Sequence, residues 1–251
     1  MLADAWRLAV GTLTIVRLRP PARVDRSTAA LAALLAPIAV VPLGLAVALV
    51  LVIGERASLN GLTTGLLAVG VLLLGTRALH VDGLSDVADG LTASYDRERS
   101  LAVMKSGTSG PAGVAATVVV LGLQAVGFAT LVGDTRSAVV AGLVVCVSRC
   151  ALATACVRGV PSARPDGLGA AFAGTVAVPT AVVSWLLGAA ALLATGHATG
   201  LSLVRCGVAV AVAVVVVVLL LVRCRSRFGG VTGDVFGAAI EVALAALLVV
   251  L

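Results

Sequence analysis

The stretch "ALHVDGLSDVADGL", residues 78–91, places three aspartates and a histidine in a chain that is otherwise poor in charge. Asp82, Asp86 and Asp89 follow a spacing of i, i+4 and i+7, so a helix would carry all three carboxylates on one stripe. Like charges in such a stripe repel one another unless a cation lies among them. Mg²⁺ suits this pattern because it takes one or two carboxylates and completes its shell with water and phosphate oxygens. The stripe therefore indicates a site for Mg²⁺ and phosphate.

A solvated helix face is the alternative explanation for this stripe. It fits less well, because Leu84, Val87 and Leu91 give the segment an apolar side and no lysine is mixed among the acids. The interpretation as a metal and phosphate site is the one we follow.

A second cluster lies in "RFGGVTGDVFGAAIE", residues 227–241. Its turn consists of Gly229, Gly230, Thr232 and Gly233. Such glycines let a backbone approach an anion, and the N–H groups of the helix that follows point to the same place. Asp234 would join the metal, and Glu241 lies two turns deeper, where a carboxylate inside a membrane is costly enough to indicate a function. Close helix packing explains the glycines equally well.

A third group is basic and lies in "SRCALATACVRGVPSARPDGLGAAFAG", residues 148–174. Arg149 and Arg164 are candidates to bind phosphate oxygens in pairs, with Asp166 beside them. Arg158 is better explained by membrane topology. These assignments make the turn around residue 164 a predicted part of a phosphate site.

Two single residues accompany the clusters. His80 precedes Asp82 by two positions and is either a general base, a hydrogen-bond partner of substrate, or a side chain at the membrane interface. Lys105 follows in "VMKSGTSGPAG", where it either contacts phosphate or is an ordinary cytoplasmic charge.

The elements that must position these residues are membrane helices. Of 251 residues, 60% are hydrophobic and only 12% are charged, which no soluble class shows. Uncharged stretches run roughly over residues 29–53, 57–76, 110–133, 137–148, 168–196, 206–222 and 235–251. Most reach the length of about 20 residues that spans hydrocarbon as a helix. We expect one all-α, polytopic membrane domain over residues 1–251, with six to seven transmembrane helices.

The charge distribution orients this bundle. The net charge is +6, yet with 3% aromatic residues it does not indicate nucleic-acid binding. Of the 18 lysines and arginines, only Arg56, Arg136 and Arg205 fall in the loops opposite the N-terminus. This asymmetry predicts a cytoplasmic N-terminus, with the acidic clusters on the same side. The N-terminal segment itself reads as an interfacial amphipathic helix and not as a cleaved signal peptide.

Four segments of the chain resemble those of a known family. "LHVDGLSDVADGL" is similar to the signature of the cobalamin synthase family, "TLTIVRLRPP" to its N-terminal segment, "SARPDGLGAAF" to its central turn and "GGVTGDVFGAAIE" to its C-terminal glycine motif. The resemblance implies an adenosylcobinamide-GDP ribazoletransferase. Such an enzyme joins α-ribazole or its 5′-phosphate to adenosylcobinamide-GDP and releases GMP, in the last step of adenosylcobalamin (vitamin B12) biosynthesis, the assembly of the nucleotide loop.

The resemblance also suggests roles and a place in the cell. Asp82, Asp86, Asp89 and Asp234 would hold one or two Mg²⁺ ions. Arg149 and Arg164 would neutralise phosphate oxygens, and His80 or one aspartate would take the proton of the attacking hydroxyl. The enzyme would lie in the bacterial cell membrane with its active face in the cytoplasm, and a membrane complex or homo-oligomer stays open. The chain has "SGTSG" after Lys105 where the family usually has an acid and an arginine, which leaves the role of Lys105 open.

Two other functions compete with this one. A CDP-alcohol phosphotransferase of phospholipid synthesis also uses spaced aspartates, but it requires an alanine-arginine pair shortly after the first Asp-Gly, which this chain lacks. An ion-coupled secondary transporter predicts acids in the middle of the spans and an inverted repeat. Here the acids gather at one face.

Overall fold

The computed structural model describes residues 1–133 and 135–251, and this part of the chain forms thirteen α-helices. Their bounds are α1 Leu2–Leu13, α2 Arg26–Ala39, α3 Val41–Arg56, α4 Gly61–Thr76, α5 Leu79–Ala93, α6 Arg97–Val103, α7 Pro111–Thr130, α8 Thr135–Ser148, α9 Cys150–Ala155, α10 Gly167–Phe172, α11 Val178–Thr199, α12 Leu203–Phe228 and α13 Gly233–Val250. In these residues only two isolated β-bridges accompany the helices. The all-α prediction is confirmed.

Six helical segments are long and apolar enough to cross a membrane. They are α2 with α3, α7, α8 with α9, α11, α12 and α13. The pair α4 and α5 passes the same test together, but the two helices meet at 94°. A seventh span follows if that pair is counted as one. The prediction of six to seven spans is therefore confirmed.

Prolines and a glycine turn mark where the predicted spans break. Pro37 lies inside α2, and Pro42 follows the break at Val40 in the first turn of α3, where a missing N–H costs nothing. The prediction of one span over residues 168–196 is wrong in its boundaries. The chain turns at Gly174, whose φ is +67°, so that segment divides into the short helix α10 and the span α11.

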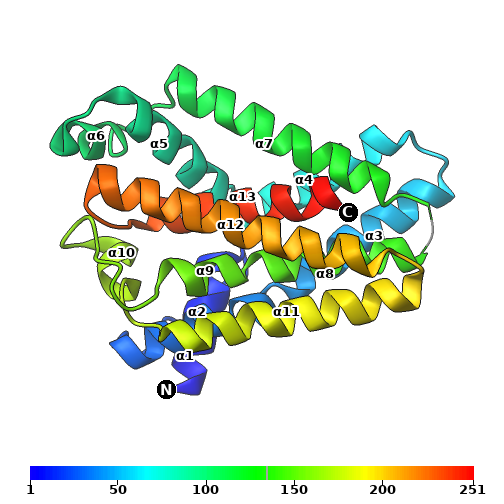
Figure 1. Ribbon diagram of the computed structural model, residues 1–251, viewed down its shortest axis with the longest axis horizontal. Helices are drawn as coiled ribbons and strands as arrows, with labels where there is room; N and C mark the ends of the chain where they lie inside the picture. The colour runs from blue at the N-terminus through cyan, green and yellow to red at the C-terminus, as the bar shows by residue number, and fades with distance from the viewer. Residues whose placement is uncertain (134) are drawn as a thin grey trace.

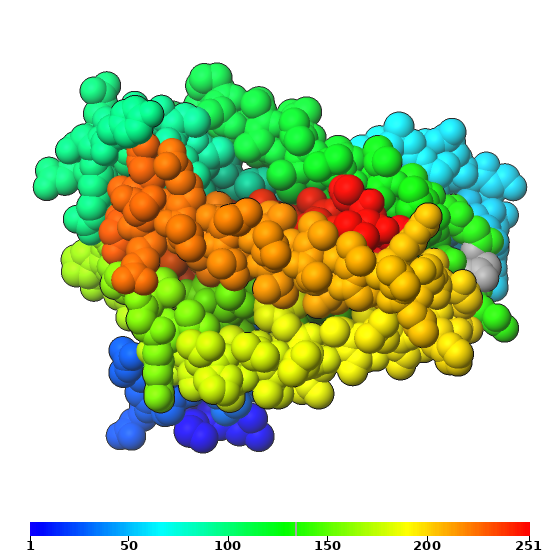
Figure 2. Space-filling view, in the orientation of Figure 1, coloured from blue at the N-terminus to red at the C-terminus, as the bar shows by residue number. Residues whose placement is uncertain are grey.

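Helix α13 is the centre of the bundle. It packs against α5, α7, α8, α9 and α12, and in the space-filling view only a patch of it is visible between α12 and α7 (Figure 2). The outer helices present their apolar side chains outward, as with Leu74 and Val204, which are 75% and 73% exposed. A soluble protein would not expose such surfaces, whereas lipid covers them in a membrane. The five cysteines are free, and four of them are buried, as predicted for small apolar residues.

The loops and short helices gather at one end of the bundle. Helices α1, α5, α6 and α10 lie there together with the end of α12 and the beginning of α7, and the C-terminus lies toward the other end (Figure 1). This end therefore contains the acidic, glycine-rich and basic motifs. The predicted cytoplasmic orientation of this end stays a prediction.

Candidate functional site

The acidic motif and the glycine motif meet where α5 crosses α13. A Cβ atom on Gly83 would lie 2.6 Å from the Asp234 carbonyl oxygen, and one on Gly237 would lie 2.8 Å from the His80 Cα atom. The two backbones are thus in contact, as small residues allow between membrane helices. The crossing brings Asp82 from one motif beside Asp234 from the other.

The carboxylates at this crossing differ in exposure. Asp82 is exposed, while Asp86 and Asp234 are half-buried. Asp82, Asp234 and Asp89 all act on Asp86 as like charges, and Arg164 is the cation that opposes them. Arg164 Nη1 lies 3.6 Å from Asp234 Oδ2, and the Thr232 hydroxyl donates to the same oxygen at 3.1 Å. The site therefore contains more negative than positive charge.

Asp89, the third aspartate of the stripe, has a different environment. It is 6% exposed, and its two carboxylate oxygens accept hydrogen bonds from the backbone N–H groups of Gly110 and Gly113 at 2.6 and 2.8 Å. These are N–H groups at the start of α7, which have no partner within that helix. Asp89 thus fixes the beginning of α7 against α5, and the structure does not bring it to the crossing with Asp82 and Asp234.

The central turn and the glycine turn are joined side by side. Val231 donates its N–H to the Pro161 carbonyl oxygen and accepts the N–H of Ala163, both at 2.9 Å. Gly230 faces the Pro161 carbonyl so closely that no side chain would fit. Packing therefore accounts for Gly230, and a role of Gly229 and Gly230 in phosphate binding stays a prediction.

Arg97 holds these turns together, a role that was not predicted from the sequence. Its Nε donates to the Phe228 carbonyl oxygen at 2.6 Å and its Nη2 donates to the Ala163 carbonyl oxygen at 2.8 Å. Its side chain also covers Gly229, whose φ of +77° reverses the chain after α12. Arg164 is fixed in a similar way, since its Nη2 donates to the Leu101 carbonyl oxygen at 2.9 Å.

A polar cavity opens beside this assembly, with an empty volume of about 560 Å³. Its wall consists of Lys105, Arg164, Asp166, Gly167, Leu168, Gly169, Thr232, Gly233 and Asp234. Lys105 Nζ lies 3.8 Å from Asp166 Oδ2, and both side chains are exposed. Thr232 caps α13, whose first N–H groups give this wall a partial positive charge. The cavity thus combines a helix N-terminus with two cations, Lys105 and Arg164, each of which is paired with a carboxylate of the same wall.

A second cavity, of about 670 Å³, shares Leu168, Gly233 and Asp234 with the first. Its wall is mostly apolar and comes from α1, α5, α9, α10 and α13. Two predicted site residues, His80 and Asp82, line it together with Asp234. Asp234 therefore stands where the polar and the apolar cavity meet.

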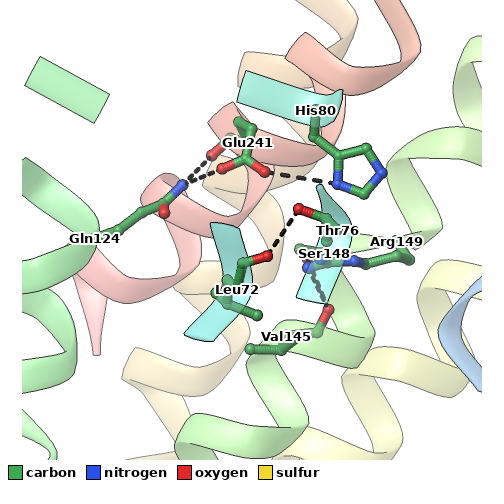
Figure 3. A network of polar contacts seen from close by, with 8 residues as sticks. All are labelled: Leu72, Thr76, His80, Gln124, Val145, Ser148, Arg149 and Glu241. Atoms are coloured by element: carbon green, nitrogen blue, oxygen red, sulfur yellow. Dashed lines mark hydrogen bonds and ion pairs between the residues drawn. The ribbon is translucent and has the colours of Figure 1, made fainter. Parts of the chain in front are cut away.

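A buried polar network includes His80, which also lines the apolar cavity (Figure 3). Glu241 Oε2 accepts a hydrogen bond from Gln124 Nε2 at 2.7 Å, and Glu241 Oε1 lies 3.7 Å from His80 Nδ1. Arg149 is 1% exposed and donates from Nη1 to the Val145 carbonyl oxygen at 2.9 Å and to the Ser148 hydroxyl at 2.8 Å. A charge buried so deeply needs an opposite charge nearby, and Glu241 supplies it.

Arg149 is not among the residues that line either cavity, and its expected contact with phosphate stays a prediction. The physical reason for its burial is its position at the break between α8 and α9, where the side chain turns into the bundle instead of toward the turn with Arg164. Gln124 belongs to the same network and was missed. A lone amide in a membrane span was the available signal, because polar side chains there pair with a partner.

The described residues include no group of three His, Cys, Asp or Glu side chains that would hold a metal ion by themselves. Mg²⁺ does not need such a group, since it keeps several waters and is commonly bound through one or two carboxylates together with substrate phosphates. Asp82, Asp86 and Asp234 are partly exposed, and their negative charge exceeds the positive charge beside them. These carboxylates fit an ion that is bound together with phosphate groups.

Comparison with known proteins gives a consistent result. The description of the matching family is cobalamin-5-phosphate synthase, and the match covers residues 5–251. A Nocardioides protein named adenosylcobinamide-GDP ribazoletransferase is 56% identical over 98% of this chain and 97% of its own length. A protein of the same name from Frankia casuarinae is 39% identical over 100% of this chain and 95% of its own, and one from Pseudomonas paraeruginosa is 39% identical over 74% and 72%. No solved structure matches this chain.

Proposed function

Because this chain belongs to the cobalamin-5-phosphate synthase family, we propose that it joins α-ribazole, or its 5′-phosphate, to adenosylcobinamide-GDP with release of GMP. The chain is an enzyme of the class that its relatives' name describes, adenosylcobinamide-GDP ribazoletransferase, and it acts in cobalamin synthesis. A ribose hydroxyl of α-ribazole, or of its 5′-phosphate, attacks the phosphorus that stays with the cobinamide; the bond from that phosphorus to the bridging oxygen breaks, and GMP leaves.

The observation that carries the site assignment is the meeting of the two motifs at Asp234. The polar cavity presents Arg164, Lys105 and the N-terminus of α13 to one ligand, and the apolar cavity presents Asp82 and His80 to another. Phosphoryl transfer asks little covalent chemistry of a protein, because positioning and neutralisation of charge provide most of the acceleration. Two ligand cavities that share one acidic wall supply that positioning.

Asp82, Asp86 and Asp234 would hold Mg²⁺, which when bound neutralises the diphosphate oxygens and the charge that develops on them. Arg164 holds the cavity-facing oxygen of Asp234 in place, since the two side chains form an ion pair. We leave Asp89 out of this set because the start of α7 already occupies both of its oxygens. Its part in the site is to position α5.

The proton of the attacking hydroxyl goes to a group that lines the apolar cavity. His80 and Asp82 both do so, and in the described part of the chain neither ring nitrogen of His80 has a hydrogen-bond partner. A base must lie within hydrogen-bond reach of the proton that it takes. The proposal therefore assigns this step to one of these two side chains.

The six apolar spans make this a multi-pass membrane protein. We propose that it lies in the bacterial cell membrane with the two cavities facing the cytoplasm, since the basic residues gather at that end. Both substrates would then reach the cavities from the cytosol without crossing the lipid. A complex with other membrane proteins or with further copies of this chain is compatible with the exposed apolar helices.

The test is GMP release by purified protein given adenosylcobinamide-GDP and α-ribazole, with Mg²⁺ and with the metal chelated. For the variant Asp82→Asn, GMP release should be low with Mg²⁺ present and should not fall further when the metal is chelated. The matched control Glu55→Gln makes the same chemical change in an exposed side chain that a positive-inside topology places on the opposite face. The proposal fails if folded wild-type protein releases no GMP with Mg²⁺ present, and the metal assignment fails if Asp82→Asn behaves like Glu55→Gln.

A further inference from the structure

The apolar cavity contains features that the transfer chemistry alone does not require. Its wall includes Leu13 of α1, Leu152 of α9 and Ile240 of α13, which are 3%, 5% and 1% exposed. Two aromatic rings, Phe172 and Phe236, lie in the same wall with their centroids 6.1 Å apart and their planes tilted by 59°. Small-molecule sites are typically concave and mostly apolar, with a few polar groups at fixed places.

The polar side chains in the wall of this cavity are those of Thr12, His80, Asp82 and Asp234. His80 is 5% exposed and lines the cavity. Its Nδ1 lies 3.7 Å from Glu241 Oε1, while its Nε2 has no hydrogen-bond partner among the described residues. A buried polar atom without a partner is costly, so such an atom in a cavity wall indicates a ligand that supplies the missing contact. Asp82 and Asp234 are on the same rim. The ligand must have an apolar, ring-shaped body and a polar end that reaches these residues.

We propose that this cavity binds the two-ring base of the nucleoside substrate, a methylated benzimidazole, with its ribose directed toward His80, Asp82 and Asp234. This inference rests on the proposed function, which supplies α-ribazole as one of the two substrates. The tilted rings of Phe172 and Phe236 give the planar base an aromatic wall of the kind that aromatic groups prefer. The ribose then meets the diphosphate at Asp234, which both cavities share.

The other candidate occupants fit the cavity less well. Guanine displays hydrogen-bond donors and acceptors around its edge, and a wall of leucine, isoleucine and phenylalanine would leave most of them unpaired, at a cost for each. A corrin ring is far larger than a cavity of about 670 Å³ that also includes space open to solvent. The diphosphate belongs with Arg164 and Lys105 in the polar cavity. The methylated base is the substrate part that an apolar wall recognises.

The inference gives a preference that can be measured. Each methyl group buried in an apolar pocket is worth about a fourfold gain in binding. Because the base of α-ribazole carries two methyl groups, α-ribazole should be preferred about 15-fold over the riboside of unsubstituted benzimidazole. Leu79 lines the cavity and is 45% exposed, so that a larger side chain there fills the cavity without disturbing the core. Leu79→Trp should raise the KM for α-ribazole about tenfold or more and reduce the preference for the methylated base. The KM for adenosylcobinamide-GDP should stay within about twofold of wild type.

A second variant and a direct binding measurement protect this test from folding effects. Leu13→Ala enlarges the cavity from α1, far from the acids in the sequence, and should weaken α-ribazole binding roughly tenfold. Leu186→Trp is the matched control, because this side chain is 61% exposed on α11 and lines neither cavity. Equilibrium dialysis of α-ribazole against purified protein measures binding without catalysis.

The outcomes separate the inference from the proposed function. Weaker α-ribazole binding in both cavity variants, with no change in Leu186→Trp, supports the inference. If the variants raise only the KM for adenosylcobinamide-GDP, or match the control throughout, the cavity does not hold the base. If wild-type protein binds α-ribazole in a manner that both variants weaken, but releases no GMP, the reaction is wrong and the cavity assignment stands.

Discussion

The close crossing of α5 and α13 predicts that a single methyl group will disable the site. In Gly83→Ala the new Cβ atom would lie 2.6 Å from the Asp234 carbonyl oxygen, and in Gly237→Ala it would lie 2.8 Å from the His80 Cα atom. Ordinary contact begins at 3.4 Å, so the helices must separate by about 0.8 Å and 0.6 Å respectively. The neighbours are backbone atoms, which cannot rotate away as the end of a side chain does.

The magnitude follows from two opposing effects. Overpacking of this kind costs about 1–3 kcal/mol of stability, and replacing glycine by alanine in a helix returns about 0.5–1 kcal/mol. The net loss should be about 1–2 kcal/mol, which leaves most of the protein folded. Activity should fall much further, because a displacement of about 1 Å at reacting groups costs on the order of 100-fold. The displacement falls between Asp82 and Asp234, where the two ligands meet.

The assay is GMP release at saturating Mg²⁺, together with the midpoint of thermal denaturation in detergent. Gly70→Ala in α4 and Gly207→Ala in α12 are matched controls, since a Cβ atom at either position would meet nothing within 4 Å. We expect about 100-fold slower GMP release in Gly83→Ala and Gly237→Ala, and wild-type rates in the controls. Rates equal to the controls would refute the claim that backbone contact at this crossing sets the geometry of the site.

Three further predictions follow from side chains near the crossing. Asp89→Asn should lower the free energy of unfolding by about 1–2 kcal/mol, because one hydrogen-bond acceptor at the start of α7 is lost. The Mg²⁺ concentration that gives half-maximal GMP release should stay at its wild-type value. A shift in that concentration would make Asp89 a metal ligand. Arg149→Met should cost about 3–5 kcal/mol by leaving Glu241 buried without its cation, and thermal denaturation should show most of the loss restored in the double variant with Glu241→Gln. Arg97→Lys should slow GMP release about tenfold, because an ammonium group cannot bridge the Phe228 and Ala163 carbonyl oxygens as the guanidinium does. An unchanged rate would show that the two turns hold together without the guanidinium of Arg97.

The sequence predicted the all-α membrane fold, because it depends on local patterns. Length and hydropathy determine the spans, and the spacing of the aspartates determines their stripe. Burial along that stripe was not predictable, and it changes from exposed at Asp82 to 6% exposed at Asp89. The burial of each aspartate depends on what lies next to that turn of α5. Asp82 faces open space, whereas Asp89 faces the start of α7.

The burial of Arg149 was likewise not predictable from the sequence. Its cytoplasmic place in the sequence favoured a phosphate contact slightly over a topological role, and its burial depends on where Glu241 lies. That residue is 92 positions further along the chain, on a different helix. An electrostatic interaction between two side chains buried in separate spans leaves no periodic signal, because only the packing of α13 against α8 and α9 creates it.

The sharp bend between α4 and α5 explains how a helix rich in aspartate is placed in an apolar bundle. Arg77 and Ala78 both have positive φ values, 57° and 54°, which cost energy for residues other than glycine and persist where neighbours enforce them. Helix α1 supplies that enforcement: Ile15 donates its N–H to the Gly75 carbonyl oxygen at 2.7 Å, and Arg77 donates to the Gly11 carbonyl oxygen at 3.2 Å. The bend of 94° sends α5 across the end of the bundle, where it crosses α13 instead of continuing along α4. The amphipathic N-terminal helix is therefore part of the device that holds the aspartates at the cavities, and it also contributes Leu13 to the apolar wall.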